Sequence, residues 1–424
     1  MTTYFEERES APAAQREQLL LERLPAALKR ARVYAPAIAE QLQGIDPNAI
    51  GRRADLEQIP VIRKSELLQA QLDMRQGRTG GQLDEVGRIF GGFSSIGWGD
   101  ALRVFASPGP IYEPEGTRPD YWRFARALYA AGFRSRQLVH NCFSYHFTPA
   151  GSMMETAAHA LGCTVFPGGI GQTEQQVRAI ADLAPAGYTG TPSFLKIILE
   201  KADELGVALP SIRRALFSGE AFPPSLQRWF AERGIDGYQA YGSADLGMMA
   251  YETSAREGLV VNEDIILEIV QPGTNRPLPA GEVGEIVVTT LNPDYPLVRF
   301  GTGDLSAVMP GMSPCGRTNM RIKGWMGRAD QTTKVRGMFV HPGQIAEVVR
   351  RHPEIRRARL VVSGQFGADL MTLSVETAHP GPDLRARITA SVRDVTKLRA
   401  ELEFMEVGTL PNDGKIIDDL RVYE

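Results

Sequence analysis

The first part of the chain repeats its apolar positions at helical spacing. Leu19, Leu20, Leu24 and Leu28 fall on one face of a helix, and most positions between them are polar. Residues 1–75 are therefore expected to form polar, largely helical structure.

Between about residues 85 and 250 the pattern alternates. Short apolar runs, such as 137–140 and 162–166, each precede or follow a stretch with helical spacing. Alternation of this kind predicts an α/β unit with a largely parallel sheet.

Beyond about residue 258 the pattern becomes that of strands. Residues 265–270 and 284–290 are apolar runs separated by a turn rich in proline and glycine. A compact tail follows, with a helix start near His341, a strand pair at 359–363 and 370–376, and a final amphipathic helix.

These patterns predict an α/β fold class with two domains. Residues 1–329 are expected to form a large N-terminal body of α/β sheets, β-rich from about 258 onward. Residues 330–424 are expected to form a small α+β C-terminal domain, which is long enough to fold around its own core.

Composition narrows the class of protein. Apolar residues make up 43% and charged residues 23% of the 424 residues, which excludes a disordered or collagen-like chain. The formal net charge of −3 gives no reason to expect nucleic acid as a partner.

Cys142, Cys163 and Cys315 form neither a disulfide framework nor a metal cluster, so a reducing compartment is expected. The N-terminal residues show no basic region followed by an apolar one, and no apolar run approaches the ~18 residues of a membrane span, so neither export nor membrane insertion is expected and the prediction is cytoplasmic.

Two glycine-punctuated segments before residue 250 carry candidate chemistry. Gly219 follows an apolar run and precedes a helix, so backbone amides freed at the turn can face a ligand closely. Tyr241 offers a flat face for adenine, and Asp245 offers a hard oxygen ligand for Mg²⁺. Taken alone, these residues also fit commoner structures, an ordinary strand–helix turn and a loop with a capping aspartate.

Two further segments lie later in the chain. Asp304 is expected on a glycine turn at a strand end, where a carboxylate can accept both ribose hydroxyls, although a hairpin aspartate fits the same sequence. The charged stretch 327–337 fits a hinge or an exposed linker. Lys415 lies on a tight turn near the end of the tail, and only eight of the 47 basic residues are lysines.

Together and in this order, the segments resemble the adenylate-forming enzyme superfamily and, within it, the phenylacetate–coenzyme A ligase branch. The resemblance runs from about residue 55 to 418, and its most specific parts are 262–264, 281–291 and 296–305. It implies the adenylate-forming fold and the use of ATP, Mg²⁺ and coenzyme A. In this family an acid and ATP form an acyl-adenylate, from which the thiol of coenzyme A displaces AMP.

The resemblance implies a role for each matching residue of the body. Asp304, helped by Arg328, would hold the ribose hydroxyls, and Tyr241 would stack on the adenine. Asp245 stands where the family places its magnesium-ligating glutamate. The full implied nucleotide-binding set is Ser94, Ser95, Gly97, Gly219, Glu220, Ala221, Tyr241, Gly242, Asp304, Arg328 and Lys415.

In the tail, the resemblance implies mobile residues. Lys415 matches the catalytic lysine that bridges the carboxylate and the α-phosphate, where a cation stabilises charge between two anionic partners. Asp330 matches the hinge about which the domain rotates between half-reactions. Lys334, Arg336 and Gly337 would shape the coenzyme A channel. The implied catalytic residues are Lys415, Arg328 and Asp330.

The acid-binding segment is aromatic. Phe143, Tyr145 and His146 lie in a stretch that resembles the substrate wall of the family, with Gly168 and Thr191 in neighbouring segments. An aromatic-lined cleft suits an aryl or bulky apolar acid. The aromatic residues of this stretch could instead alternate into a sheet, and His146 either steers the acid or makes only structural hydrogen bonds.

Two departures from the family concern the phosphate end of ATP. The family expects a Ser/Thr/Gly-rich loop ending in a lysine, but segment 93–100 has none, and no lysine occurs between Lys64 and Lys196. The serines and glycines of the segment still offer hydroxyls and close-approach amides. Arg103 is either a replacement cation or ordinary surface charge. Residues 244–245 read Ala-Asp where Ser/Thr-Glu is usual, so the carboxylate is one methylene shorter.

The sequence thus predicts a cytoplasmic, AMP-forming acid–coenzyme A ligase that acts on an aryl or related carboxylic acid. Its expected partner is a small-molecule acid, without nucleic acid or membrane, and a homodimer is compatible with the sequence. Two alternatives remain. One is an adenylating enzyme that passes the acyl group to an amine or a carrier protein. The other is a degenerate homologue that binds nucleotide or acyl-coenzyme A without activating acids.

Overall fold

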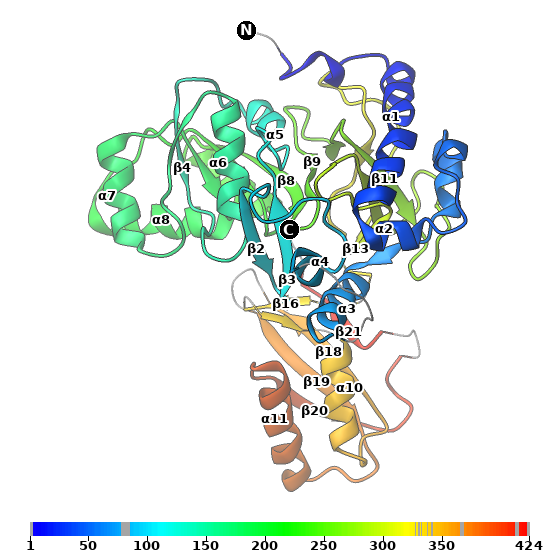
Figure 1. Ribbon diagram of the computed structural model, residues 1–424. Helices are drawn as coiled ribbons and strands as arrows, with labels where there is room; N and C mark the ends of the chain where they lie inside the picture. Colours follow the sequence, from blue (N-terminus) through cyan, green and yellow to red (C-terminus); the bar gives the residue numbers. More distant parts are fainter. Residues whose placement is uncertain are drawn as a thin grey trace. The chain divides into compact units, whose positions relative to one another are not determined.

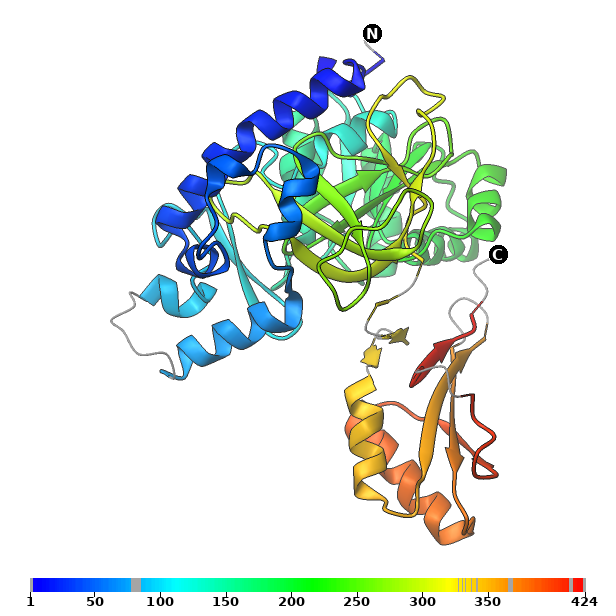
Figure 2. The ribbon, with the colours of Figure 1, turned by 90° about the vertical axis from the view of Figure 1, so that its right-hand side faces the viewer.

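The chain forms two compact units, and each is considered by itself. The computed structural model describes residues 3–77, 85–326, 328–329, 331, 333–336, 338–340, 342–364, 369–411 and 415–421. The first unit comprises Met1–Phe222 and Leu226–Met326, and the second comprises Gly327–Glu424 with Pro223–Ser225 (Figures 1 and 2).

The N-terminal part of the first unit is helical, as predicted. Leu20, Leu24 and Leu28 are buried in the core, whereas Leu19 is 47% exposed. Its placement on the apolar face was wrong, because adjacent residues of a helix point about 100° apart. The elements are η1 (Glu7–Glu9), α1 (Ala13–Tyr34), α2 (Pro36–Gln41), η2 (Pro47–Ala49), η3 (Arg53–Gln58), α3 (Lys64–Arg75) and α4 (Glu85–Phe90).

A large mixed sheet forms the centre of the first unit. Its strand order in the described residues is β14-β15-β10-β9-β8-β7-β6-β4-β5. The strands are β4 (Leu138–Asn141), β5 (Thr164–Phe166), β6 (Gly187–Gly190), β7 (Arg214–Phe217), β8 (Asp236–Ser243), β9 (Gly247–Tyr251), β10 (Leu259–Val261), β14 (Val308–Met309) and β15 (Arg321–Ile322). Strands β5, β4, β6, β7 and β8 pair in parallel, which confirms the predicted α/β fold class.

Helices supply the crossovers that parallel strands require. Helix α6 packs on β4 and β5, α8 packs on β6, and α7 lies beside α8 (Figure 1). The helices of this part are α5 (Ala125–Ala130), α6 (Ala150–Ala160), α7 (Thr173–Leu183), α8 (Pro192–Leu205) and α9 (Pro224–Glu232).

A second sheet confirms the predicted β-rich part. Its strand order is β1-β13-β12-β11, and a separate hairpin pairs β2 with β3. The strands are β1 (Ile62–Arg63), β2 (Arg103–Ser107), β3 (Ile111–Glu115), β11 (Ile265–Val270), β12 (Gly284–Thr290) and β13 (Phe300–Ser306). Asp304 lies inside β13, so its placement on a turn at a strand end was wrong. Gly303 has a φ of +74°, and the pairing of β13 with β12 shifts register between Glu285 and Val287. The glycine therefore allows an irregular backbone conformation within the strand.

The second unit is an α+β structure around one core. Helices α10 and α11 lie on the same face of a sheet with the order β20-β19-β18-β21 (Figure 2). Val348, Leu360, Leu373 and Ile388 meet in that core. The elements are β16 (Thr333–Val335), β17 (Met338–Val340), α10 (Pro342–Arg351), β18 (Arg357–Ser363), β19 (Leu370–Glu376), α11 (Pro382–Thr396), β20 (Glu401–Met405) and β21 (Ile417–Asp419).

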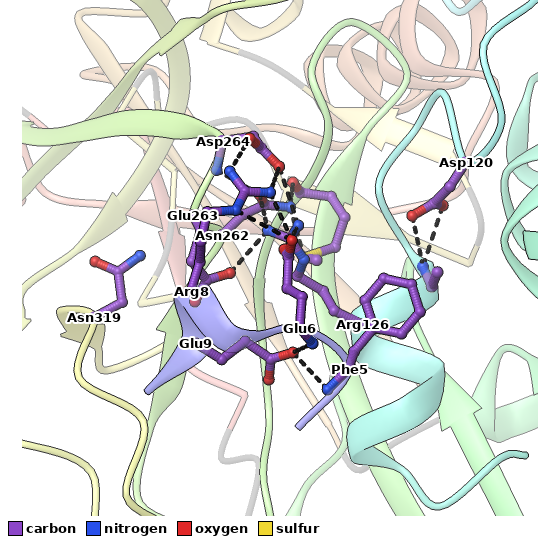
Figure 3. A network of polar contacts seen from close by, with 12 residues as sticks. Phe5, Glu6, Arg8, Glu9, Asp120, Arg126, Asn262, Glu263, Asp264 and Asn319 are labelled. Carbon is purple, nitrogen blue, oxygen red and sulfur yellow. Dashed lines mark hydrogen bonds and ion pairs between the residues drawn. The ribbon is translucent and has the colours of Figure 1, made fainter. Parts of the chain in front are cut away.

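A buried arginine fastens the N-terminal residues to the first unit (Figure 3). The Arg126 guanidinium donates to Glu263 Oε2 at 2.8 Å and to Asp264 Oδ2 at 3.0 Å, and it also contacts Glu6. Arg8 donates to Asp264 Oδ1 at 2.7 Å. Burial disfavours the charged form of Asp264, but the two arginines outweigh it and hold its pKa well below the usual range. Residues 262–264, which carry part of the family resemblance, therefore bind the two arginines that attach the N-terminal residues.

No helix within the described ranges is both long enough and apolar enough to cross a membrane.

Candidate active site

The predicted nucleotide segments meet where parallel strands of the large sheet end. Thr191 follows β6 and caps α8, because its Oγ1 accepts a hydrogen bond from the Phe194 amide at 3.3 Å. Glu220 follows β7, and its Oε2 accepts from Ser193 Oγ at 2.5 Å. The carboxyl edge of parallel strands is the usual ligand-binding edge of such sheets.

Gly219 leaves open space at this edge. Its φ is +79°, a left-handed conformation, and a Cβ built there would meet no atom of the described residues within 4 Å. Gly219 is exposed, and Glu220 and Ala221 are half-buried beside it. Gly242, by contrast, is explained by packing, because a Cβ would come within 2.8 Å of the Phe124 ring.

The Asp304 carboxylate is oriented by neutral donors on both oxygens. Tyr241 Oη donates to Oδ2 at 2.7 Å, and Trp325 Nε1 donates to Oδ1 at 3.1 Å. The Asp304 amide donates to Thr302 Oγ1 at 3.1 Å, which fixes the backbone beneath. Tyr241 and Asp304, which are 63 residues apart in sequence, are thus brought into direct contact. Trp325 was missed, because nothing in its sequence surroundings marks it.

The predicted phosphate segment is a compact turn. Ser94 Oγ donates to the Ile96 carbonyl at 2.7 Å and accepts from the Ile96 amide at 3.1 Å. The Ser95 amide donates to the Asp294 carbonyl at 2.9 Å. The Gly97 carbonyl accepts from the Ala101 amide at 2.9 Å. The segment is therefore tied to the 292–295 region of the chain.

Asp245 lies in the tight turn between β8 and β9 and is an ion-pair partner. Lys64 Nζ, at the start of α3, donates to Asp245 Oδ2 at 2.8 Å. The Asp245 side chain is 1% exposed and that of Lys64 is 34% exposed. Lys64, the last lysine before the lysine-free stretch, thus forms an ion pair with Asp245, the expected metal ligand. The sequence did not predict this contact.

A second buried carboxyl group, that of Glu113, interacts with the Asp245 carboxyl group. Glu113 lies on β3, which packs against α3 (Figure 1), and its Oε1 accepts from Ser107 Oγ at 2.5 Å. Burial, and next the charge of Asp245, raise the pKa of Glu113 to about 9. Glu113 Oε2 and Asp245 Oδ1 are buried, and neither has a hydrogen-bond partner among the described residues. Such hard oxygen donors fit Mg²⁺. Sequence reasoning missed Glu113, because a glutamate in a short strand carries no sign of burial.

Arg103 is engaged with the other glutamate of β3. Its Nη1 donates to Glu115 Oε2 at 3.1 Å, and Ser152 Oγ donates to Glu115 Oε1 at 2.9 Å. Glu115 is fully buried, so Arg103 serves as its counter-ion.

The aromatic segment after β4 does not alternate into a sheet, because β4 ends at Asn141. Phe143 is 7% exposed and belongs to the core. Tyr145 Oη donates to Glu155 Oε2 at 2.8 Å and accepts from Asn141 Nδ2 at 2.8 Å. His146 is exposed, and its amide donates to Ser144 Oγ.

Gly168 is required by close approach. An added Cβ would lie 2.6 Å from Gln176 Oε1 and 3.0 Å from His140 Nε2, two atoms that are themselves hydrogen-bonded at 2.7 Å. His140 is buried and stacks on Phe166, and desolvation lowers its pKa.

Of the tail residues, Lys415 and Arg336 are described with their contacts. Lys415 is 51% exposed, and its Nζ donates to Asp418 Oδ1 at 2.9 Å. The Arg336 amide donates to Asp369 Oδ2 at 2.7 Å. Arg328 and the backbone of Lys334, in β16, are also described, whereas Asp330 and Gly337 lie outside the described residues.

Comparison with known proteins decides the family. The model of the AMP-binding enzyme family matches residues 122–292. The phenylacetate–coenzyme A ligase of Thermus thermophilus is 32% identical over 390 residues, which cover 88% of this chain and 83% of that protein. The chain belongs to the phenylacetate–coenzyme A ligase family of adenylate-forming enzymes. The predicted family is confirmed.

Further relatives agree with this assignment. The Escherichia coli phenylacetate–coenzyme A ligase is 28% identical over 445 residues, with 97% of each chain covered. A solved structure of 2-hydroxyisobutyryl-coenzyme A ligase, in complex with 2-HIB-AMP and coenzyme A, has a TM-score of 0.77 at 24% identity. The match covers 100% of this chain and 93% of that one. At this identity the likeness concerns the fold, and it confirms the predicted adenylate-forming fold.

Proposed function

We propose that this protein is an AMP-forming acid–coenzyme A ligase that acts on an aryl or related carboxylic acid. A carboxylate oxygen of the acid attacks the α-phosphorus of ATP, and pyrophosphate leaves. The sulfur of coenzyme A then attacks the acyl carbonyl, the thiol proton is lost, and AMP leaves. Membership of the phenylacetate–coenzyme A ligase family supports both steps.

The oriented Asp304 carboxylate is the observation that carries the proposal. Its two oxygens are fixed by Tyr241 and Trp325, so they can accept the paired hydroxyls of a ribose without losing their orientation. Gly219 leaves room at the sheet edge for the adenine. In this proposal Tyr145, His146 and Thr191 face the acid.

The tail residues take the roles that the family resemblance implies. Lys415 provides the cation between the carboxylate of the acid and the α-phosphate, and residues 330–424 rotate about the region of Asp330 between the two steps. Lys334, Arg336 and Gly337 shape the channel for the coenzyme A thiol.

Asp245 would hold Mg²⁺ at the phosphate end. Bound there, Mg²⁺ neutralises charge on the phosphates and on the departing pyrophosphate. Ser94, Ser95 and Gly97 supply hydroxyls and amides on the same side of the nucleotide.

The first test is acid-dependent exchange of pyrophosphate into ATP, with phenylacetate and a panel of aryl and alkyl acids. We expect exchange with at least one aryl acid, followed by thioester and AMP when coenzyme A is added. Exchange without thioester would place the enzyme with ligases that use another acyl acceptor. No exchange with any acid would overturn the proposal.

The second test concerns Lys415. Lys415→Ala should reduce exchange by roughly 10²–10³-fold, the usual loss when one charge-stabilising group is removed, and should leave AMP binding largely intact, because most of the implied nucleotide contacts remain. Lys397→Ala is the matched control, because Lys397 is an exposed lysine of the same unit that pairs with Asp394 at 3.5 Å. Equal activity of both variants would remove Lys415 from the mechanism.

A further inference from the structure

The hairpin of β16 and β17 turns at a residue in an unusual backbone conformation. Its strands pair as far as Val335 with Met338, so two residues make the connection. The first of them, Arg336, has a φ of +47°, in the left-handed region. The short hairpin turns that fit twisted strands require a positive φ, which glycine and asparagine adopt at least cost. An arginine in this conformation costs free energy, so the surrounding structure must hold it.

Asp369 holds Arg336 by three hydrogen bonds. The Arg336 amide donates to Asp369 Oδ2 at 2.7 Å. The guanidinium reaches the backbone of the same residue, because Nε and Nη2 donate to the Asp369 carbonyl at 3.2 and 2.9 Å. Asp369 is 9% exposed, so water competes little for its carboxylate. One residue thus fixes both the main chain and the side chain of the turn.

A buried ion pair orients Asp369 itself. Arg421 Nη1 donates to Asp369 Oδ1 at 2.9 Å, and the two side chains are 8% and 12% exposed. Arg421 also donates to Thr333 Oγ1 in β16 and to Asp419 Oδ1 in β21. The Asp369 carboxylate is therefore bound at both oxygens, by a backbone amide at one and by a guanidinium at the other.

We propose that Asp369 is the positioning residue of the β16–β17 turn, and that loss of its carboxylate slows thioester formation and spares adenylate formation. This role rests on the proposed function, in which Lys334, Arg336 and Gly337 shape the channel for the coenzyme A thiol. The wall of a channel acts through the placement of its backbone, and a displacement of about 1 Å can lower a rate roughly 10²-fold. Asp369 supplies this placement and needs no contact with a reactant.

Adenylate formation should not depend on Asp369. Lys415, the residue implied for that step, donates to Asp418 Oδ1 at 2.9 Å, and the amide of the next residue donates to Gln331 Oε1 at 2.7 Å. The lysine thus has supports of its own. If Asp369 only stabilised the second unit, both steps would weaken together.

The test measures the two steps separately in Asp369→Asn of the full-length protein. Both carboxylate oxygens accept from N–H donors, so an amide must turn its own NH₂ group against one of them. Pyrophosphate exchange reports adenylate formation, and rapid mixing of the preformed acyl-adenylate enzyme with coenzyme A reports thioester formation. We expect thioester formation to fall roughly 10–100-fold, the range for a lost hydrogen bond to a charged group, and pyrophosphate exchange to stay within about twofold.

Asp419→Asn is the matched control. Asp419 is a second carboxylate bound by Arg421, at 2.8 Å, but it lies in β21. This variant should lose a similar amount of stability, measured by thermal unfolding, and keep its rate of thioester formation. Equal loss of thioester formation in both variants would assign the effect to the second unit as a whole, and would overturn the proposal.

A double-mutant cycle with Arg336→Gly tests the backbone strain. Glycine adopts a positive φ freely, so the turn of this variant depends less on Asp369. Whatever Arg336→Gly does alone, Asp369→Asn should lower the rate of thioester formation less than about threefold in that background. An equal loss in both backgrounds would show that Asp369 does not act through the backbone of Arg336, which contradicts the proposal.

A further readout needs no enzymatic activity. The amide of Arg336 is hydrogen-bonded, so deuterium uptake by the peptide that spans the turn should be slow in the unaltered protein and faster in Asp369→Asn. Equal uptake would overturn the positioning role. No pyrophosphate exchange with any acid would overturn the proposed function and with it the effect on thioester formation. Unchanged thioester formation in Asp369→Asn would instead overturn the role of Asp369 alone.

Discussion

At the adenosine end of the site, the half-buried Asp304 carboxylate accepts hydrogen bonds from two neutral donors, Tyr241 and Trp325. At the phosphate end, the buried Asp245 carboxylate is paired with Lys64 and also interacts with the carboxyl group of Glu113. The partners of Asp304 include two hydrogen-bond donors from other strands and loops, whereas Asp245 has a lysine as its ion-pair partner and a second carboxyl group beside it.

The two ends of the proposed site therefore hold their carboxylates in different ways. Segment 93–100, which the family resemblance assigns to the phosphate end, has no lysine, and Lys64 and Glu113 interact with Asp245. We therefore expect changes at the two ends to separate nucleotide binding from chemistry.

The largest effect is expected from Asp245→Asn. Removing the charge that holds the cation should lower pyrophosphate exchange by roughly 10²–10³-fold, the range found for single charge-stabilising groups. AMP binding, measured by calorimetry, should stay unchanged because AMP lacks the β- and γ-phosphates. An equal loss of AMP affinity would show that the two ends are not separable.

A smaller effect is expected from Asp304→Asn. Hydrogen bonds to a charged group contribute about 1.5–3 kcal/mol, so AMP and ATP should both bind roughly 10–100-fold more weakly. Exchange at saturating ATP should fall much less. Calorimetry with AMP measures the loss of nucleotide binding, and the ATP dependence of exchange separates that loss from any change in the rate at saturating ATP. A variant that binds AMP normally would contradict the ribose assignment.

Much of the fold could be predicted, because local periodicity determined it. Strands β11 and β12 and the start of α10 follow from apolar runs and turn residues, and the alternation between 85 and 250 predicted the parallel sheet. The errors were local. Leu19 was placed on the buried face, but it is largely exposed. The glycines around Asp304 suggested a turn, but they lie within the irregular strand β13.

The site was predictable only where single residues carry a family motif. Tyr241 and Asp304 could be named, but their contact joins two sheets and is invisible in the sequence. Glu113, Lys64 and Trp325 could not be found at all. Each acts through a partner far along the chain, and nothing in a residue's neighbours in sequence encodes which distant side chain it will face.

A third effect is expected on stability from Lys64→Met. Removing one partner of a buried ion pair leaves the other charge uncompensated, a loss we place at about 1–2 kcal/mol because Lys64 is partly exposed. Thermal unfolding followed by circular dichroism measures it. If a cation is the second counter-ion of Asp245, Mg²⁺ should raise the melting temperature of this variant more than that of the unaltered protein. An equal rise in both would argue that Lys64 and the cation do not share Asp245.

The smallest effect is expected from Trp325→Phe, which removes one of the two donors to Asp304 and keeps most of the ring. The indole is partly exposed, so water can replace its hydrogen bond, and a loss of about 0.5–1 kcal/mol, a few-fold in AMP affinity, is expected. Tyr241→Phe removes the other donor, which lies closer at 2.7 Å. The double variant should lose more than the sum of the single ones, because residues that bond to the same carboxylate are coupled. Strict additivity would mean that the carboxylate is held by its strand, and that the neutral donors are not what distinguishes the adenosine end.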